Sequence, residues 1–176
     1  MFSVRTAVVD QLPHLRRYAL FLTRDPTLAD DMVQESVARA IDRADQFRPG
    51  TNFRAWLFTI LRSVFLNHQR AASRRHAVDI DGVAAPEVAT RANQESRAEL
   101  TRLEDALDEL TPDHRDILLL IVVEGFTYEE AAEILDIALG TVRSRLARAR
   151  GELNNRLRDP LEEDTAASAP ENETDG

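Results

Sequence analysis

Hydrophobic residues recur every three or four positions between residues 8 and 75, the spacing of helices that bury one face. No run in this stretch alternates between apolar and polar residues as a half-buried strand does. One helix start is marked by Asp25, Pro26 and Thr27, with Pro26 suited to the first turn. Asp30 follows three residues after Thr27, which predicts a capping box at those two positions.

Two helices of this half each have one apolar face. On the helix after Pro26 we expect burial of Val33, Val37, Ala40, Ile41 and Ala44. A loop at residues 47–52 precedes the second helix, which Thr51 or Asn52 can cap. Its predicted buried residues are Phe53, Trp56, Leu57, Ile60 and Val64. Because Trp56 lies within this face, we expect it in the core.

The periodic pattern stops after residue 75. Residues 76–94 are rich in small, acidic and turn-forming side chains, as in the run DIDGVAAPEVAT, which is typical of a linker. We therefore expect an all-α protein with two small helical domains, residues 1–75 and 95–158, joined by a flexible acidic linker. The polar and acidic residues 159–176 are typical of a disordered tail.

The second domain carries several helix boundaries. A helix from residue 95 to Leu110 is followed by Thr111 and Pro112, a cap and first-turn pair that starts another helix, which ends at Gly125. Thr127 then begins a capping box, with an acid three residues later, for a short helix to residue 135. A turn of a few residues and a last helix to about residue 158 complete a helix-turn-helix layout, whose second helix enters the DNA major groove.

The last helix has two distinct faces. Its apolar residues, which fall within about 80° of arc at 100° per residue, are Val142, Leu146, Ala149, Leu153 and Leu157. The opposite face carries Thr141, Arg143, Ser144, Arg145 and Arg148. Small residues there let the backbone approach DNA, and guanidinium groups can reach phosphates or a guanine edge. A solvated arginine face is the alternative, but the preceding capping box and tight turn favour DNA binding.

Net charge conceals an uneven distribution. The 176 residues carry 22 basic and 31 acidic side chains, a net charge of −9, and every basic residue is Arg. Residues 1–75 nevertheless hold 12 Arg against 7 acids, and residues 141–158 hold 6 Arg against one Glu. The negative excess lies in residues 76–110 and 159–176. Two basic segments in an acidic chain raise the expectation of an anionic partner.

Three stretches resemble the extracytoplasmic-function group of bacterial RNA polymerase sigma factors. FTYEEAAEILDIALGTVRSRLARARGEL is similar to the helix-turn-helix of that family. LRRYALFLTRDPTLADDMVQESVARA resembles its polymerase-binding segment, and FRPGTNFRAWLFTILRS resembles the segment before its promoter-melting helix. The departures are Asp136 and Ala138 in the turn, where Gly and Pro are common, and Ser63, where Asn is usual.

The resemblance implies three binding sites. Residues 1–75 correspond to sigma region 2, whose contacts with the β′ clamp helices of core RNA polymerase fall here on Asp31, Gln34 and Glu35. Recognition and melting of the −10 element fall on Arg48, Asn52, Arg62, Asn67, Arg70, Arg74 and Arg75. Residues 95–158 correspond to region 4, which binds the β flap and reads the −35 element through Thr141, Arg143, Ser144, Arg145 and Arg148.

The stretches PGTN, RAWLFTILR and LRRYA also resemble the alphaproteobacterial general-stress subgroup. That subgroup implies control by a small helical anti-sigma factor, which a response regulator with a sigma-like domain removes. The implied function is promoter-specific transcription initiation in a stress response. A sigma-like mimic that sequesters an anti-sigma factor without binding DNA is a second reading, and a stand-alone helix-turn-helix regulator is a third.

Several other classes of protein are disfavoured by the sequence. With no cysteine there is no disulfide, thiolate metal site or cysteine nucleophile. The four His lack metal-ligand spacing, and no Gly-rich phosphate loop, GxSxG or HExxH occurs, so we expect no catalytic residue, metal or cofactor. No signal peptide or apolar run of about 18 residues is present, so we expect a cytoplasmic protein without membrane insertion.

Overall fold

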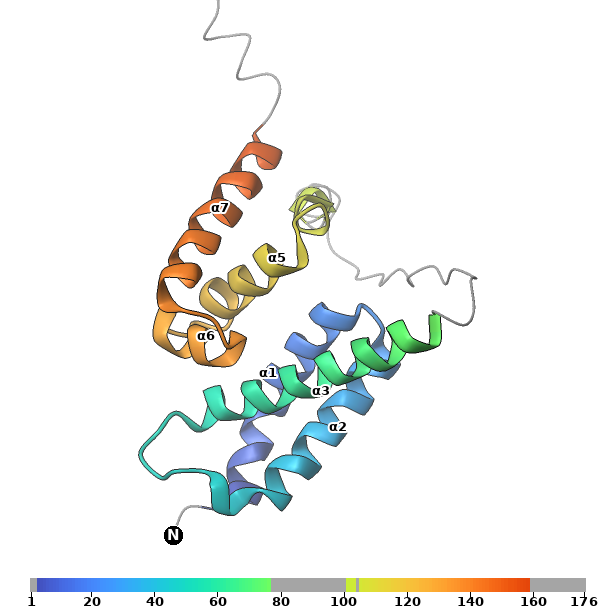
Figure 1. Ribbon diagram of the computed structural model, residues 1–176, viewed down its shortest axis with the longest axis vertical. Coiled ribbons are helices and arrows are strands. Elements are labelled where there is room, and N and C mark those ends of the chain that lie inside the picture. Colours follow the sequence, from blue (N-terminus) through green and yellow to red (C-terminus); the bar gives the residue numbers. More distant parts are fainter. Residues whose placement is uncertain (1–2, 77–100, 104, 159–176) are drawn as a thin grey trace, which may run out of the picture.

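The computed structural model describes residues 3–76, 101–103 and 105–158, and it is helical without a strand in those ranges. The predicted tail, all of the predicted linker except His76, and residues 95–100 of the predicted second domain lie outside the described residues. Two groups of helices are visible in Figure 1, one built from the first 76 residues and one from the chain after residue 100. The predicted all-α fold is confirmed.

The first group consists of three long helices, α1 (Val4–Thr23), α2 (Pro26–Asp42) and α3 (Phe53–His76), with a short 3-10 turn η1 (Ala44–Gln46). Each helix contacts the other two (Figure 1). Pro13 lies inside α1 and does not end it. The fully buried core of this group includes Leu15, Tyr18, Met32 and Leu57.

The cap of α2 differs from the prediction. The Asp25 carboxylate accepts hydrogen bonds from the backbone N–H groups of Thr27 and Leu28, at 2.8 and 3.1 Å. Pro26 therefore occupies the first helical position, and Asp30 lies beyond the first turn, where it pairs with Arg16 at 2.7 Å. The predicted capping box of Thr27 and Asp30 is wrong because a better cap precedes the proline.

Burial along α2 and α3 is broader than the predicted stripes. On α2 the buried residues are Ala29, Met32, Val33, Ser36 and Ala40. Val37 and Ile41 are partly buried, whereas Ala44 is exposed because α2 ends at Asp42. On α3 the prediction holds for Leu57, Ile60 and Val64, but Phe58 and Leu61 are buried as well. The reason is that α3 packs on α1 and α2 with one face and on the second group with another.

Trp56 is half-buried rather than fully buried. Its ring lies 5.4 Å from that of Phe47 and 5.9 Å from that of Phe53, and the three form one aromatic cluster at the start of α3. Asn52 caps this helix, because its Oδ1 accepts hydrogen bonds from the N–H groups of Arg54 and Ala55 at 2.9 and 3.2 Å.

The second group begins with helical residues 101–103 and 105–108 and continues with α5 (Pro112–Leu118). Thr111 caps α5 through the N–H of His114, as predicted. A π-helical turn η2 (Leu119–Val123) extends α5 to Gly125, whose φ of +71° ends it. The helices α6 (Tyr128–Leu135) and α7 (Leu139–Leu157) follow.

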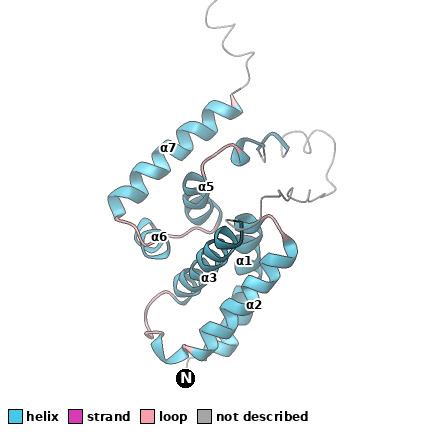
Figure 2. Ribbon diagram, turned by 45° about the vertical axis from the view of Figure 1, so that its right-hand side comes forward, coloured by secondary structure: helices cyan, strands magenta, loops and turns pink. Residues whose placement is uncertain are grey.

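The two groups share one hydrophobic core. Helix α6 packs on α3, and Figures 1 and 2 both show these two helices side by side. The rings of Phe58 and Phe126 meet edge to face at 4.8 Å across this boundary. The buried apolar cluster is continuous from α1 to α7. In this arrangement the two units are packed against each other, although the sequence left their relative placement open.

Candidate nucleic-acid interface

The predicted helix-turn-helix forms between Thr127 and Leu157. Both halves of the capping box are present, with the Thr127 hydroxyl accepting from the N–H of Glu130 and the Glu130 carboxylate accepting from the N–H of Thr127. Asp136 ends α6 with φ of +54°, a left-handed conformation that Asp tolerates better than most residues. Asp136 thus takes the place in which Gly is common in the family, and the turn still forms.

Helix α7 has the predicted two faces. Val142, Leu146 and Ala149 are buried against α5 and α6, and Leu153 and Leu157 are partly buried. On the opposite face Arg143, Ser144 and Arg148 are exposed, and the Ser144 hydroxyl donates to the backbone oxygen of Thr141 at 3.1 Å. Thr141 is half-buried.

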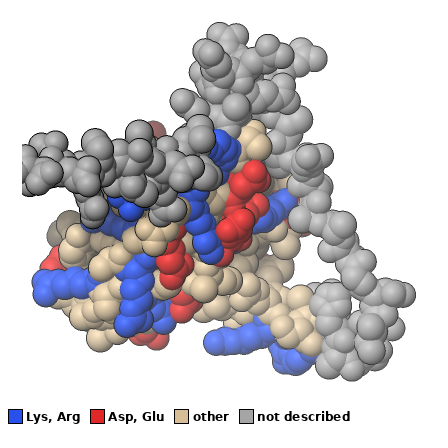
Figure 3. Space-filling model, turned by 90° about the horizontal axis from the view of Figure 1, so that it is seen from above, with Lys and Arg blue, Asp and Glu red and all other residues tan. Residues whose placement is uncertain are grey.

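Arg145 differs from its neighbours on α7. Its Nη2 lies 2.9 Å from a carboxylate oxygen of Asp113 in the first turn of α5, and its side chain is 27% exposed. Arg143 and Arg148 are therefore the freer cations on this face. Figure 3 shows basic and acidic side chains lying next to one another over one face of the molecule.

Five of the seven residues predicted for the −10 element are exposed and belong to α3 or to the loop before it: Arg48, Asn52, Asn67, Arg70 and Arg74. Arg75 lies in α3, but its side chain is outside the described residues. Asn52 and the partly buried Arg62 contact the second group of helices. The Asn52 amide donates to the Glu130 carboxylate at 2.5 Å, and the Arg62 guanidinium donates to Asp116.

The predicted polymerase-binding residues all lie on α2. Asp31 and Gln34 are exposed. Glu35 is half-buried, with one carboxylate oxygen 2.5 Å from Arg39 and the other 3.0 Å from His68. The hydrogen bond from His68, assisted by the charge of Arg39, lowers the pKa of Glu35.

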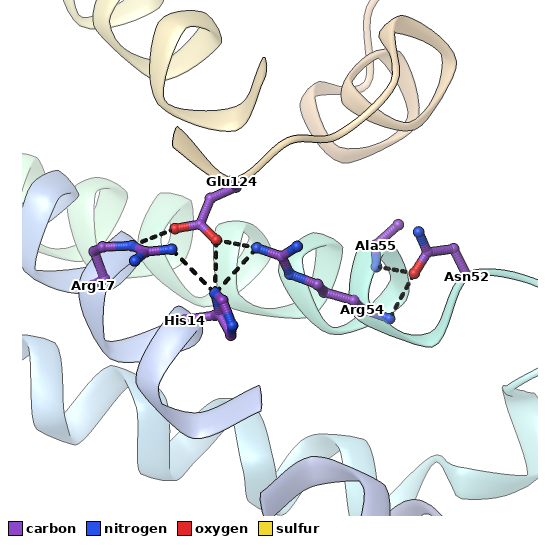
Figure 4. A network of polar contacts seen from close by, with 6 residues as sticks. All are labelled: His14, Arg17, Asn52, Arg54, Ala55 and Glu124. Carbon is purple, nitrogen blue, oxygen red and sulfur yellow. Dashed lines mark hydrogen bonds and ion pairs between the residues drawn. The ribbon is translucent and has the colours of Figure 1, made fainter. Parts of the chain in front are cut away.

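Two buried carboxylates of the second group reach into the first group. The Glu124 side chain has no solvent exposure, and its Oε1 accepts from Nε of Arg17 at 2.7 Å. Its Oε2 contacts Arg54 and lies 3.1 Å from Nδ1 of His14 (Figure 4). Burial alone would raise the pKa of Glu124, but the hydrogen bonds from Arg17 and His14 and the charge of Arg54 hold it below its ordinary value.

Asp116 forms the second buried contact between the groups. Its Oδ1 accepts from the hydroxyl of Tyr18 at 2.6 Å, and its Oδ2 accepts from Arg62. Tyr18 is fully buried. Burial raises the pKa of the Asp116 carboxyl and the pKa of the Tyr18 hydroxyl. The negative charge of Asp116 raises the pKa of the Tyr18 hydroxyl further. The exposed pair of Arg24 and Asp108 adds a further contact at the edge.

Sequence reasoning missed this pair of carboxylates. Asp116 precedes the apolar run ILLLIVV and Glu124 follows it, so two acids bracket the most hydrophobic stretch of the second group. An acid beside a buried run is a signal for a buried ion pair, because charged side chains are almost never buried without partners. Identifying the partners requires the tertiary structure.

The described residues hold neither a metal site nor a membrane-spanning helix. In residues 3–76, 101–103 and 105–158 no cluster of His, Asp and Glu has an arrangement that could hold a metal ion. None of the helices in those ranges is long and apolar enough to cross a membrane.

Both groups of helices match known families. Residues 8–62 match the Sigma2 domain of PhyR, and residues 100–153 match sigma-70 region 4. The ECF RNA polymerase sigma factor EcfG of Rhodopseudomonas palustris is 41% identical over 152 residues, which cover 86% of this chain and 83% of EcfG. SigL of Mycobacterium tuberculosis, another ECF sigma factor, is 36% identical over 137 residues, covering 75% of this chain and 76% of SigL.

Solved structures agree with these relatives. The sigma factor RpoE of Bartonella quintana, crystallised in complex with the anti-sigma factor NepR, is 36% identical. It superposes with a TM-score of 0.71 over 86% of this chain and 94% of RpoE. The two helical units follow one another in the order of sigma regions 2 and 4, and EcfG is 41% identical over most of both chains. The chain therefore belongs to the ECF family of RNA polymerase sigma factors.

Proposed function

We propose that this chain binds core RNA polymerase and directs it to promoters that carry −35 and −10 elements. The observation that carries the proposal is α7, a helix with a buried apolar face and an exposed face that presents Arg143, Ser144 and Arg148. A helix of this kind behind a capped helix and a tight turn is the arrangement that enters a major groove. Membership of the ECF sigma factors supplies the polymerase as partner.

The proposal assigns a role to each unit. Residues 1–75 act as region 2, with the β′ clamp helices contacting Asp31, Gln34 and Glu35 on α2. The −10 element is opened by Asn67, Arg70, Arg74 and Arg75 of α3, together with Arg48, Asn52 and Arg62. Residues 95–158 act as region 4, which contacts the β flap and reads the −35 element through Thr141, Arg143, Ser144, Arg145 and Arg148. The linker at 76–94 lets the units separate on the polymerase.

Regulation by an anti-sigma factor is part of the proposal. RpoE of Bartonella quintana, at 36% identity, forms a complex with the anti-sigma factor NepR. We infer that a small helical protein of the same kind holds this chain inactive until a stress signal releases it. The factor then acts in the cytoplasm, where the polymerase is, and it contributes no covalent chemistry of its own.

The test is transcription with core RNA polymerase of Rhodopseudomonas palustris, whose EcfG is 41% identical. Added to core enzyme and a library of genomic fragments from that organism, the chain should produce transcripts with common −35 and −10 sequences. Arg143→Ala with Arg148→Ala should abolish these transcripts without loss of core binding, because only groove contacts are removed. The control is Arg5→Ala, an exposed arginine on α1. Core binding without transcription from any fragment would overturn the proposal.

A second candidate is the sigma-like mimic, which sequesters an anti-sigma factor. The match of residues 8–62 to the Sigma2 domain of PhyR favours it, since PhyR of Bartonella quintana is described as an anti-anti-sigma factor. The exposed arginines of α7 favour the sigma factor, because a mimic has no need of them. The double variant Arg143→Glu, Arg148→Glu discriminates: unchanged activity in cells would support the mimic, and loss of activity would support the sigma factor.

A further inference from the structure

Four basic side chains of the first unit converge on the two buried carboxylates of the second. We call Arg17, Arg54, Arg62 and His14 the arginine face; it is formed by α1 and α3. Glu124 contacts three of its members and Asp116 contacts the fourth. Figure 4 shows Arg17, His14 and Arg54 around the single carboxylate of Glu124.

The chemistry of this face is not specific for carboxylates. A guanidinium presents N–H donors in a fixed fork, and that fork matches the oxygens of a phosphate as well as those of a carboxylate. The face is also not saturated when the units are packed together. In the described part of the chain, Nε of Arg54 is buried and has no hydrogen-bond acceptor. An anion with more oxygens could use this donor.

The energetics make the contact exchangeable. A buried ion pair contributes little net stability, because the desolvation of both charges offsets most of their attraction. Removal of the carboxylates is costly while the units stay packed, because it leaves buried charges without a partner. Exchange of the carboxylates for another anion, as the units separate, does not carry this cost. The arginine face also adjoins the predicted −10 surface, because Arg62 belongs to both. Asn52, another residue of the −10 surface, lies two positions before Arg54 in the sequence and contacts Glu130 of the second unit.

We propose that the arginine face binds backbone phosphates of promoter DNA beside the −10 element, and that Asp116 and Glu124 occupy the phosphate positions when the two units are packed together. The inference rests on the proposed function and extends it: Arg17, Arg54 and His14 join Arg62 as DNA-binding residues. Packing of the units and binding of DNA to this face then exclude each other, so the second unit blocks part of the DNA surface of the first.

The test uses the full chain. Because it has no cysteine, Thr59→Cys on α3 and Glu133→Cys on α6 allow a fluorescence-transfer pair at two exposed positions. Asp116→Asn with Glu124→Gln keeps side-chain shape and removes both charges, so energy transfer should fall. Affinity for a fluorescein-labelled single-stranded oligonucleotide should rise about tenfold, since opening frees phosphate contacts of the kind that dominate affinity.

The decisive variant adds Arg17→Ala and Arg54→Ala to the variant with Asp116→Asn and Glu124→Gln, which we call the opened variant. The gain in affinity should be lost, and the slope of log K against log salt should become shallower by about 1.4, or about 0.7 for each phosphate contact with a single strand. Arg5→Ala, an exposed arginine on the same helix as Arg17, is the matched control and should leave both values unchanged.

A measurement on the chain with its native charges covers the case in which the opened variant fails to fold. Titrating the unlabelled oligonucleotide into the fluorescence-transfer pair should lower energy transfer as DNA displaces the second unit. Unchanged affinity and slope after loss of Arg17 and Arg54, or DNA binding without loss of energy transfer, would overturn the inference even if transcription occurs. Absence of transcription with core enzyme, with these DNA effects intact, would instead overturn only the proposed function.

Discussion

Individual side chains in this protein are held by partners that the local sequence does not supply. Glu35, a predicted polymerase contact, pairs with Arg39 of its own helix and also with His68 of α3. Arg145, on the predicted DNA-binding face of α7, forms an ion pair with Asp113 of α5. The charge that each residue offers to a partner molecule is therefore set by its neighbours, and residues of one predicted site need not contribute equally.

Removal of His68 should change the titration of Glu35. Because the His68 hydrogen bond is the largest cause of its lowered pKa, His68→Ala should raise that pKa toward the ordinary value of 4.5. A lowered pKa in the folded state means that Glu35 contributes stability above pH 4.5, which is lost as the pH falls through the folded value. The variant should lose the part of that contribution that His68 supplies, and the part that Arg39 supplies should remain. The carboxyl carbon shift of Glu35 in NMR spectra, followed against pH, measures the effect.

The matched control is His114→Ala, which removes a histidine lying 3.0 Å from Glu152 in the other unit. It should leave the Glu35 titration unchanged. A Glu35 pKa that does not move in His68→Ala would mean that Arg39 alone sets it.

At the scale of elements, short-range chemistry decides where helices begin and end. Thr111 caps α5 and the Thr127 box caps α6, both as the sequence predicts. At α2 the sequence offers two candidate caps, Asp25 before Pro26 and Thr27 after it, and the cap is Asp25 rather than the predicted Thr27. Gly125 separates η2 from α6 with a positive φ, whereas Gly151 lies within α7.

Alanine at these two glycines should have opposite effects. A Cβ at either position meets no atom within 4 Å, so only backbone conformation matters. Gly125→Ala forces a left-handed conformation on a side chain and should lower the free energy of unfolding by about 1 kcal/mol. Gly151→Ala replaces glycine inside a helix and should raise it by about 0.5 to 1 kcal/mol. Urea denaturation followed by circular dichroism measures both, and shifts of the same sign would contradict the expectation.

Across the whole molecule, acids pair with arginines between the two units and also accumulate at the end of the sequence. Asp116 and Glu124 bind the arginine face, and the last 18 residues hold seven acids and no base. Both features oppose DNA binding by the free factor. The first acts at contact distance, and the second acts through the long-range field of the chain.

Deletion of residues 160–176 should raise the affinity of the free chain for DNA at low salt. Six acids are removed with that segment and no base, so repulsion of the phosphate backbone decreases. The gain should shrink as salt is added, because the Debye length falls from about 30 Å at 0.01 M to about 10 Å at 0.1 M. Fluorescence anisotropy with a labelled duplex measures it. A control chain in which the six acids are replaced by their amides should match the deletion, and an unchanged affinity in both would refute the prediction.

The sequence by itself determined the helices, most of their caps, the buried and exposed faces of α7 and the likeness to ECF sigma factors. These follow from residues within a few positions of one another, where spacing and capping chemistry act. Only the tertiary structure decided the second buried face of α3 and the contacts that join the two units. Arg62 meets Asp116 across 54 residues and Arg17 meets Glu124 across 107. Periodicity carries no information at that separation, since such pairing depends on which surfaces the folded helices bring together.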